Sequence, residues 1–129
     1  KYPHAEFSLS CPRLRPIINN DKIKPTDIGE RELCQVLCAY RIFLPFVGIT
    51  VSSRENANFR NGIVKIAATK ISAGVSTGIG DHEKKYTGKS SDKEGDEQFV
   101  ISDDRSLATM YRDMSRGGLQ PVLNDYVYV

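Results

Sequence analysis

The stretch of sequence that decides the fold is Gly48-Ile49-Thr50-Val51-Ser52-Ser53-Arg54-Glu55. Its apolar residues Ile49 and Val51 alternate with polar neighbours, and a two-residue period is typical of a β-strand. The stretch then ends in four consecutive polar or charged residues. Ser53 is a residue type that caps helices, and Glu55 is favourable in a first helical turn. The sequence therefore predicts a strand over 48–53, a polar cluster at its end and a helix that continues to about Lys65.

The same pattern of strand and polar cluster occurs on both sides of this stretch. Residues 6–11 alternate in the same way and lead into a polar cluster at 10–15, and residues 69–73 form a short strand that ends at Gly74. A helical stretch separates each strand from the next, and parallel strands joined by helices have their carboxyl ends on the same side. The sequence thus predicts an α/β fold whose three polar clusters converge on one edge as a ligand site.

The helix before residue 48 has clear signals at both ends. Asp27 followed by Glu30 has the spacing of an N-cap and capping box, and Pro45 closes a helix that ends near Leu44. Its apolar residues fall at three- and four-residue steps and predict one buried stripe. The members of this stripe are Leu33, Val36, Leu37, Tyr40, Phe43 and Leu44.

The remaining third of the chain begins with more than twenty residues that lack apolar periodicity, 74–97. Such segments are usually functional lids or disordered. A short strand is predicted over 97–101, and a last helix is predicted to begin at a cap of Asp103 or Asp104 and to stop at Gly117-Gly118. The apolar positions of this helix are Leu107, Met110, Tyr111 and Met114. The apolar and aromatic tail over 119–129 is expected to pack against the rest.

Composition excludes several classes of function. With 18 basic and 16 acidic residues among 129, the chain lacks the charge excess of a nucleic-acid-binding surface or a membrane-surface patch. No apolar stretch approaches the roughly 20 residues that span a bilayer. Three cysteines without disulfide-scaffold spacing fit a reducing compartment, so a cytoplasmic location is expected. The chain starts at Lys1 without an initiator methionine, and we expect it to be a piece of a longer protein.

Arg54 and Ser72 are the first candidates for a binding site, because each lies at the end of a predicted strand. A guanidinium at this place could hold a carboxylate through two parallel hydrogen bonds, which a lysine could not reproduce. The alternative is a salt bridge across the strand ends, for example to Glu55. A hydroxyl at Ser72 could bind a polar substrate group, or it could simply satisfy a backbone group.

The other candidates are weaker. Arg13 and Arg15 flank Leu14, so one is expected to face the ligand edge and the other solvent, and a structural role is as plausible as a functional one. Cys34 and Cys38 share a helix face but lack the further ligands of a zinc site, so they are expected to be small buried residues, and Cys11 continues the apolar face of its strand. His4 and His82 lie in terminal and loop segments, where a solvated imidazole is expected.

Four segments, in this order and spacing, resemble the C-terminal part of the radical S-adenosylmethionine aromatic amino acid lyases, and the tyrosine lyases of thiamine synthesis match best. The segments are Ser8 to Pro16, Ser52 to Glu55, Ile71 to Gly74, and Glu97 to Phe99 leading to Asp103-Asp104-Arg105-Ser106. The resemblance implies the last three strands of a (β/α)8 barrel, residues 1–74. It also implies a flexible loop, 75–96, and the biotin and thiamine synthesis associated region, 97–129.

The resemblance also implies an activity for the parent protein. In the family, a 4Fe-4S cluster held by a CxxxCxxC motif cleaves S-adenosylmethionine to a radical, and the Cα–Cβ bond of tyrosine then breaks to give p-cresol and 2-iminoacetate, a thiazole precursor. Arg54 matches the arginine that binds the substrate carboxylate, and Ser72 matches a serine near the α-substituents. Ser10, Arg13 and Arg15 match other motif residues and are expected to be substrate-binding. Thiazole-synthesis proteins are the partners that the resemblance implies.

The chain departs from this family pattern because it has no CxxxCxxC. We therefore expect the cluster and S-adenosylmethionine to be held elsewhere in the full-length protein, no cofactor to be bound by this chain, and the chain alone to be inactive. The hydrogenase-maturation tyrosine lyase carries an additional C-terminal cysteine cluster, whereas residues 120–126 contain no cysteine. That enzyme, tryptophan lyase and a stand-alone binding module without redox chemistry remain alternatives. Three strands alone would leave two unpaired edges, so self-association of the isolated chain is also expected.

Overall fold

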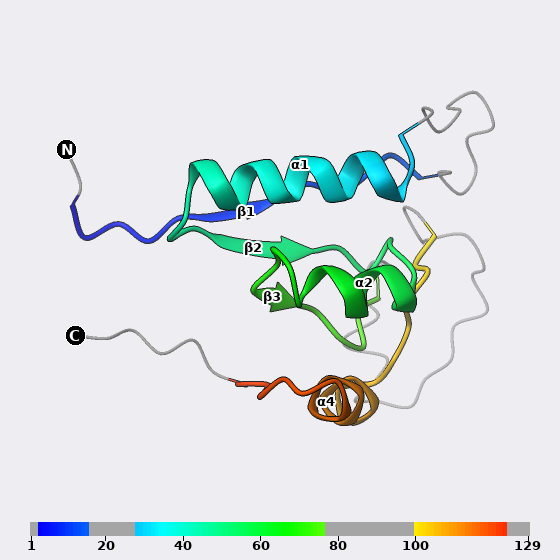
Figure 1. Cartoon of the computed structure of the whole chain (residues 1–129). Helices are drawn as coiled ribbons and strands as arrows, with labels where there is room; N and C mark the ends of the chain where they lie inside the picture. The colour runs from blue at the N-terminus through cyan, green and yellow to red at the C-terminus, as the bar shows by residue number, and fades with distance from the viewer. Residues whose placement is uncertain (1–2, 16–27, 77–99, 124–129) are drawn as a thin grey trace.

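The computed structural model of the chain describes residues 3–15, 28–76 and 100–123 (Figure 1). Within these residues a strand-helix-strand-helix-strand unit is followed by a further helix, as the sequence predicts. The elements are β1 (Ser8–Ser10), α1 (Glu30–Phe43), β2 (Gly48–Val51), α2 (Ala57–Ile63), β3 (Lys70–Ile71) and α4 (Leu107–Arg116). Each strand is shorter than the predicted one, and β1 and β3 lose residues at both ends. None of the described helices is long and apolar enough to cross a membrane.

The sheet has the strand order β1-β2-β3, and both neighbouring pairs are parallel. Leu9 pairs with Ile49, and Val51 pairs with Ile71, which fixes the register. All three carboxyl ends consequently lie at one edge of the sheet, as predicted. We call the residues that follow the strands here, 11–15, 52–55 and 72–74, the carboxyl edge.

The two faces of the sheet differ in chemistry. Ile49 and Val51 are 0 % and 2 % exposed and pack in one apolar core with α1 residues Leu33 and Leu37, which are also buried. The other face carries the residues that alternate with these apolar ones, and paired residues share a face. Its members within the strands are Ser8, Ser10, Gly48, Thr50 and Lys70. We call this side the polar face, and Figure 1 shows no described helix lying across it as α1 and α2 lie across the apolar one.

Helix α1 buries only part of its predicted stripe. Its N-cap is Gly29, whose amide donates to Glu32 Oε2 at 2.9 Å, while the predicted cap Asp27 lies outside the described residues. Leu33 and Leu37 are buried and Tyr40 is half-buried, but Phe43 is 83 % exposed. The prediction for Phe43 is wrong, and Val36 and Leu44 are also exposed. The face of α1 that packs on the core also carries Cys34 and Cys38, so Val36 and Phe43 lie on the opposite flank of the helix.

Helices α2 and α4 begin at caps that differ from the predicted ones. Asn56 Oδ1 accepts from the Phe59 amide at 2.9 Å, so Asn56 caps α2 in place of Ser53. Ser106 Oγ accepts from the Thr109 amide at 3.3 Å, so Ser106 caps α4 in place of Asp103 or Asp104. In both cases the predicted cap precedes the true one by three residues or fewer, and the carboxylate of Asp103 is bound by Arg60 and Arg105 instead.

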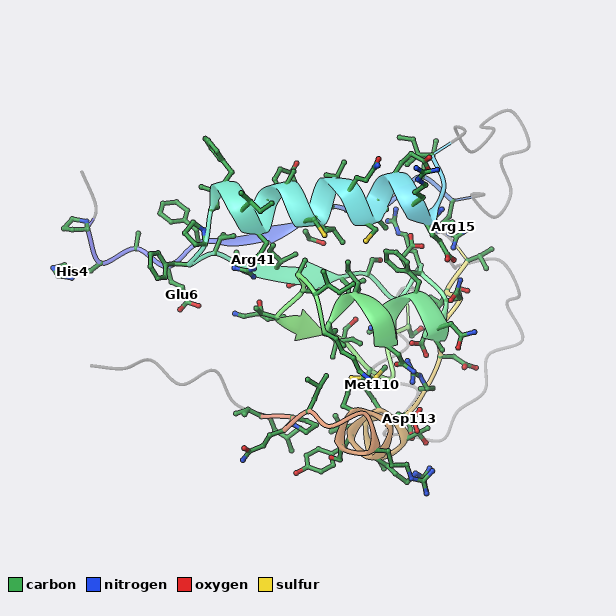
Figure 2. The ribbon with its side chains drawn as sticks, in the orientation of Figure 1. His4, Glu6, Arg15, Arg41, Met110 and Asp113 are labelled. Atoms are coloured by element: carbon green, nitrogen blue, oxygen red, sulfur yellow. The ribbon has the colours of Figure 1, made fainter. Side chains whose placement is uncertain are left out.

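Helix α4 packs against the rest of the molecule through its two methionines. Met110 and Met114 are buried, and Met110 points from α4 towards α2 in Figure 2. Leu107 and Tyr111, the other two apolar positions of the predicted helix, are exposed. The helix ends at Gly117, and Gly118 follows with a φ of 82°, a left-handed conformation that glycine adopts without strain and that confirms the predicted stop.

Other parts of the C-terminal prediction are tested only in part. Residues 100–101 are not in a strand, and the rest of the predicted strand lies outside the described residues. Most of the predicted loop 75–96 and the end of the tail, 124–129, also lie outside the described residues. Val122 and Leu123, at the end of the described tail, are exposed, so this portion does not pack as predicted.

Candidate substrate site at the carboxyl edge

The carboxyl edge brings the predicted site residues together. Arg13 and Arg15 follow β1, Arg54 follows β2 and Ser72 follows β3, and the parallel strands place all four at the same end of the sheet. Ser10 is the last residue of β1 and lies in register with Thr50 on the polar face, where it is exposed. The convergence predicted from the three polar clusters is therefore observed.

Glu55 is the anion of this edge, and it is fully buried. Arg13 Nε donates to its two carboxylate oxygens at 3.0 and 3.1 Å, Arg13 Nη2 donates to Oε2, and Arg15 Nη2 lies 3.6 Å from Oε2. These hydrogen bonds to Glu55 are the main cause of the raised pKa of Arg13. The carboxylate joins the end of β1 to the end of β2. Arg13 and Arg15 thus make a salt bridge across the strand ends, and both side chains face Glu55, which corrects the expectation that one of them faces solvent.

The backbone of Arg54 is held from two sides. Arg15 Nε and Nη2 donate to the Arg54 carbonyl oxygen at 3.1 and 2.9 Å, and the Arg54 amide donates to Ser52 Oγ at 3.2 Å. The residue is half-buried. A fixed backbone reduces the entropy that its side chain must lose on binding a ligand.

Ser72 is held by a buried arginine of α2. Arg60 is 0 % exposed, its Nη2 donates to the Ser72 carbonyl oxygen, and the same nitrogen lies 3.4 Å from Ser72 Oγ. Arg60 Nη1 donates to Asp103 Oδ2 at 2.6 Å. Burial lowers the pKa of Arg60, although the bond to Asp103 opposes that shift.

Asp103 is buried between two guanidinium groups. Arg105 donates from Nε to Oδ1 at 2.8 Å and from Nη2 to Oδ2 at 2.7 Å, in addition to the bond from Arg60. Burial disfavours the ionised carboxylate, but the hydrogen bonds from Arg105 and Arg60 outweigh it and lower the pKa of Asp103 to about 2. Arg105 Nη1 also donates to Asp113 Oδ2 at 2.8 Å, which connects this cluster to α4. Asp113 is labelled in Figure 2.

The cysteines and histidines do not assemble a metal centre in the described part of the chain. Cys34 and Cys38 are half-buried against the core, and burial together with a hydrogen bond between the two thiols raises the pKa of Cys34. Within residues 3–15, 28–76 and 100–123, no three His, Cys, Asp or Glu side chains are placed to hold a metal ion. These described residues do not fit an iron-sulfur cluster. His4 is exposed, and His82 lies outside the described residues.

The sequence analysis placed Glu55 at this edge but missed its burial and its pairing with Arg13 and Arg15. It missed Arg60 and Asp103 as members of the edge. A signal for Glu55 was present, because the period that buries Ile49, Val51 and Ser53 places Glu55 on the same side. A buried carboxylate needs a cation, and Arg13 and Arg15 follow the neighbouring strand. Arg60 and Asp103 are 43 residues apart, and no local pattern announces their contact.

Comparison with known proteins shows to which family the chain belongs. The model of the Biotin and Thiamin Synthesis associated domain matches residues 10–120. The chain belongs to this family. It is 33 % identical over 126 residues to a 2-iminoacetate synthase of Escherichia coli (strain K12). The aligned stretch covers 97 % of this chain and 31 % of that relative. A 2-iminoacetate synthase of Salmonella typhimurium is 32 % identical over the same length. The chain thus spans about a third of these relatives.

Solved structures agree with this family. The X-ray structure of the FeFe-hydrogenase maturase HydG from Carboxydothermus hydrogenoformans matches 87 % of the chain, and 24 % of that protein, with a TM-score of 0.69 at 28 % identity. A second HydG, a maturase of the [FeFe]-hydrogenase, matches 87 % of the chain and 23 % of that protein with a TM-score of 0.70 at 30 % identity. The predicted resemblance is confirmed: the chain is similar to the C-terminal region shared by these radical S-adenosylmethionine enzymes.

Proposed function

We propose that the chain is the C-terminal, substrate-holding part of a radical S-adenosylmethionine tyrosine lyase that forms 2-iminoacetate for thiazole synthesis. The observation that carries this proposal is the gathering of Arg54 and Ser72 at one edge of a parallel sheet, in a chain similar to 2-iminoacetate synthases over 97 % of its length. A rigid edge with a guanidinium and a hydroxyl is suited to an α-amino acid, because it offers partners for both polar groups on Cα.

The three strands are proposed to be the last three of a (β/α)8 barrel, formed by residues 1–74. The polar face supports this, because a barrel interior needs a face free of helices, and its substrate site lies at the carboxyl ends of the strands. Residues 75–96 are then a loop, and residues 97–129 the associated C-terminal region. The contacts of residues 102–105 with the ends of β2 and β3 are consistent with such a region capping the barrel mouth.

Each predicted site residue has a proposed role. The Arg54 guanidinium binds the tyrosine carboxylate with two hydrogen bonds, and the Ser72 hydroxyl contacts the amino group. Ser10 lines the substrate pocket from β1. Arg13 and Arg15 border the same pocket, while their donors hold Glu55 and the Arg54 carbonyl oxygen.

A 4Fe-4S cluster and S-adenosylmethionine, held by other parts of the full-length protein, would supply a 5′-deoxyadenosyl radical. The residues of this chain hold the carboxylate and the amino group so that the Cα–Cβ bond stands in one orientation. The chain alone is proposed to be inactive. Thiazole-synthesis proteins are the proposed recipients of the 2-iminoacetate.

The proposal is tested on the full-length protein, incubated anaerobically with S-adenosylmethionine, a reductant and tyrosine. We expect p-cresol and 5′-deoxyadenosine in equal amounts, and the absence of both would contradict the assignment. Similarity to the HydG maturases favours one alternative, a hydrogenase-maturation lyase, and release of carbon monoxide and cyanide from the same incubation would identify it. Replacing tyrosine by tryptophan tests the tryptophan lyase. A stand-alone binding module would bind an amino acid without cleaving S-adenosylmethionine.

A further inference from the structure

We propose that the buried pair Arg60–Asp103 is a positioning device that fixes the distance between Arg54 and Ser72. The inference rests on the proposed function, because it assigns these two residues to the substrate. It adds positioning residues that do not face the substrate, one on α2 and one in the segment before α4. In Figure 1 this segment, residues 100–106, runs beside the carboxyl edge on its way to α4.

The first contact of the segment is with the end of β2. The amides of Ser102 and Asp103 both donate to the Ser53 carbonyl oxygen, at 3.0 and 3.1 Å. Ser53 is 7 % exposed and directly precedes Arg54. The backbone that leads into the proposed carboxylate-binding arginine is therefore bound to residues about fifty positions further along the chain.

The second contact is with the end of β3. The Gly74 amide donates to the Arg105 carbonyl oxygen at 2.9 Å, and Arg60 holds Ser72 through the backbone carbonyl and the hydroxyl. Gly74 has a φ of 61°, so the chain turns sharply after Ser72. Ser72 is thus held between α2 on one side and the segment before α4 on the other.

Asp103 joins the two contacts. Its amide binds the end of β2 while its carboxylate binds Arg60, the residue that holds the end of β3. A single residue consequently sets the spacing of the two strand ends. The hydrogen bonds run from Ser53 through Asp103 and Arg60 to Ser72.

The burial of Arg60 argues for a positional role. Arg60 is 0 % exposed, and its Nε has no hydrogen-bond partner among the described residues. Burying a guanidinium with one unsatisfied donor is costly, and a buried ion pair adds little to stability over an apolar pair of similar size. The cost of this buried pair is easier to explain if the pair positions its neighbours than if it only stabilises the fold.

The molecule supplies a matched control at the opposite edge of the sheet. Arg41 donates to the carbonyl oxygens of Pro45 and Val47, which precede β2, and of Ala67, which precedes β3, at 2.8 to 3.1 Å. It therefore links the same two strands at their other ends, and Figure 2 labels it far from Arg15 of the carboxyl edge. The variant Arg41→Lys loses the same kind of hydrogen bonds away from Arg54 and Ser72.

The test compares Arg60→Lys, Asp103→Asn and Arg41→Lys in the full-length protein. We expect Arg60→Lys and Asp103→Asn to raise the KM for tyrosine about tenfold, because misplaced groups bind the substrate less well, with the KM for S-adenosylmethionine changed less than twofold. Arg41→Lys should change neither KM by more than about twofold. In a Ser72→Ala background, where residue 72 no longer offers its hydroxyl, the effect of Arg60→Lys should shrink to about twofold.

Two results would overturn the inference. One is an equal rise in the tyrosine KM for Arg41→Lys and Arg60→Lys. The other is an Arg60→Lys effect that persists in full in the Ser72→Ala background. If Arg60→Lys does not fold, the milder variant Asp103→Asn carries the same comparison.

A second measurement separates this inference from the proposed function. Hydrogen exchange of the Ser102 and Gly74 amides, which donate to Ser53 and Arg105, needs no substrate. Both amides should exchange about tenfold faster in Asp103→Asn and Arg60→Lys than in Arg41→Lys, and equal exchange in all three would refute the link. A wild-type protein that fails to cleave tyrosine refutes the proposed function alone.

Discussion

Arg54 is the side chain whose chemistry is most specific in the proposed site. Arg54→Lys keeps the positive charge but loses the planar pair of donors that fits a carboxylate. We expect the KM of the full-length protein for tyrosine to rise about tenfold to a hundredfold, as loss of a charged hydrogen bond predicts. The KM comes from p-cresol formation. The control Arg31→Lys, on the exposed side of α1, should leave it unchanged. An unchanged KM in Arg54→Lys would remove this arginine from the site.

Asp103 makes the free energy of unfolding depend on pH in the acid range. Its pKa of about 2 in the folded state lies below the ordinary aspartate value of 3.8, so the ionised carboxylate stabilises the fold above about pH 4. This stabilisation, on the order of 2 kcal/mol, is lost as the pH falls from about 4 to 2. Urea unfolding at several pH values measures it. Asp103→Asn should flatten the acid limb, whereas Asp104→Asn, at the exposed neighbouring position, should retain it. An acid limb that is the same in both variants would contradict this account.

The N-cap of helix α4 is expected to contribute to the free energy of unfolding. Ser106 Oγ accepts from the Thr109 amide, so Ser106→Ala should lower the free energy of unfolding by about 1 kcal/mol. Ser115→Ala is the matched control in the same helix. Ser115 Oγ bonds the Tyr111 carbonyl oxygen on the exposed side, and alanine is a better helix former there. Urea denaturation should show a loss for the first variant and none for the second, and equal losses would argue against the assigned cap.

The order of the elements could be predicted from the sequence, but their exact ends could not. Alternation identified β1 and β2, because Leu9, Ile49 and Val51 face the core, whereas β3 was predicted from a short β-branched run that ends at Gly74. Caps were misplaced where several polar residues follow one another. Ser53 precedes Asn56, and Asp103 precedes Ser106, and in each case the later of the two residues is the cap. The carbonyl of Ser53 and the carboxylate of Asp103 are used by segments far away in the sequence.

The candidate site was predicted in part. Placing Arg13, Arg15, Arg54 and Ser72 at one edge required only the rule that parallel strands share a direction. The pairing of Arg13 with Glu55 spans 42 residues and depends on strand order, which local patterns do not determine. The exposure of Phe43 was missed for a related reason. Helical spacing places it at the margin of the stripe, and only the tertiary contacts show that α1 is turned so that Cys34 and Cys38, not Phe43, face the core.

The molecule as described exposes a large apolar surface at the edge opposite the site. Phe7, Ile42, Phe43 and Phe46 are 68 %, 82 %, 83 % and 98 % exposed. Exposed apolar patches and unpaired strand edges favour association. We expect the 129-residue chain, purified alone, to form dimers or larger species in light scattering. The double variant Phe43→Lys, Phe46→Lys should shift the chain towards the monomer, and Leu107→Lys, at an exposed position at the start of α4, should not. A compact monomer of the unaltered chain would contradict the proposal that these strands are part of a larger barrel.

A crystal structure of the full-length protein with tyrosine tests the central claim most directly. The account predicts two hydrogen bonds of about 3 Å from the Arg54 guanidinium to the tyrosine carboxylate, with the Ser72 hydroxyl within reach of the amino group. The Arg60–Asp103 pair should be intact behind them. Tyrosine bound at another part of the protein, with Arg54 directed away from its carboxylate, would contradict the account.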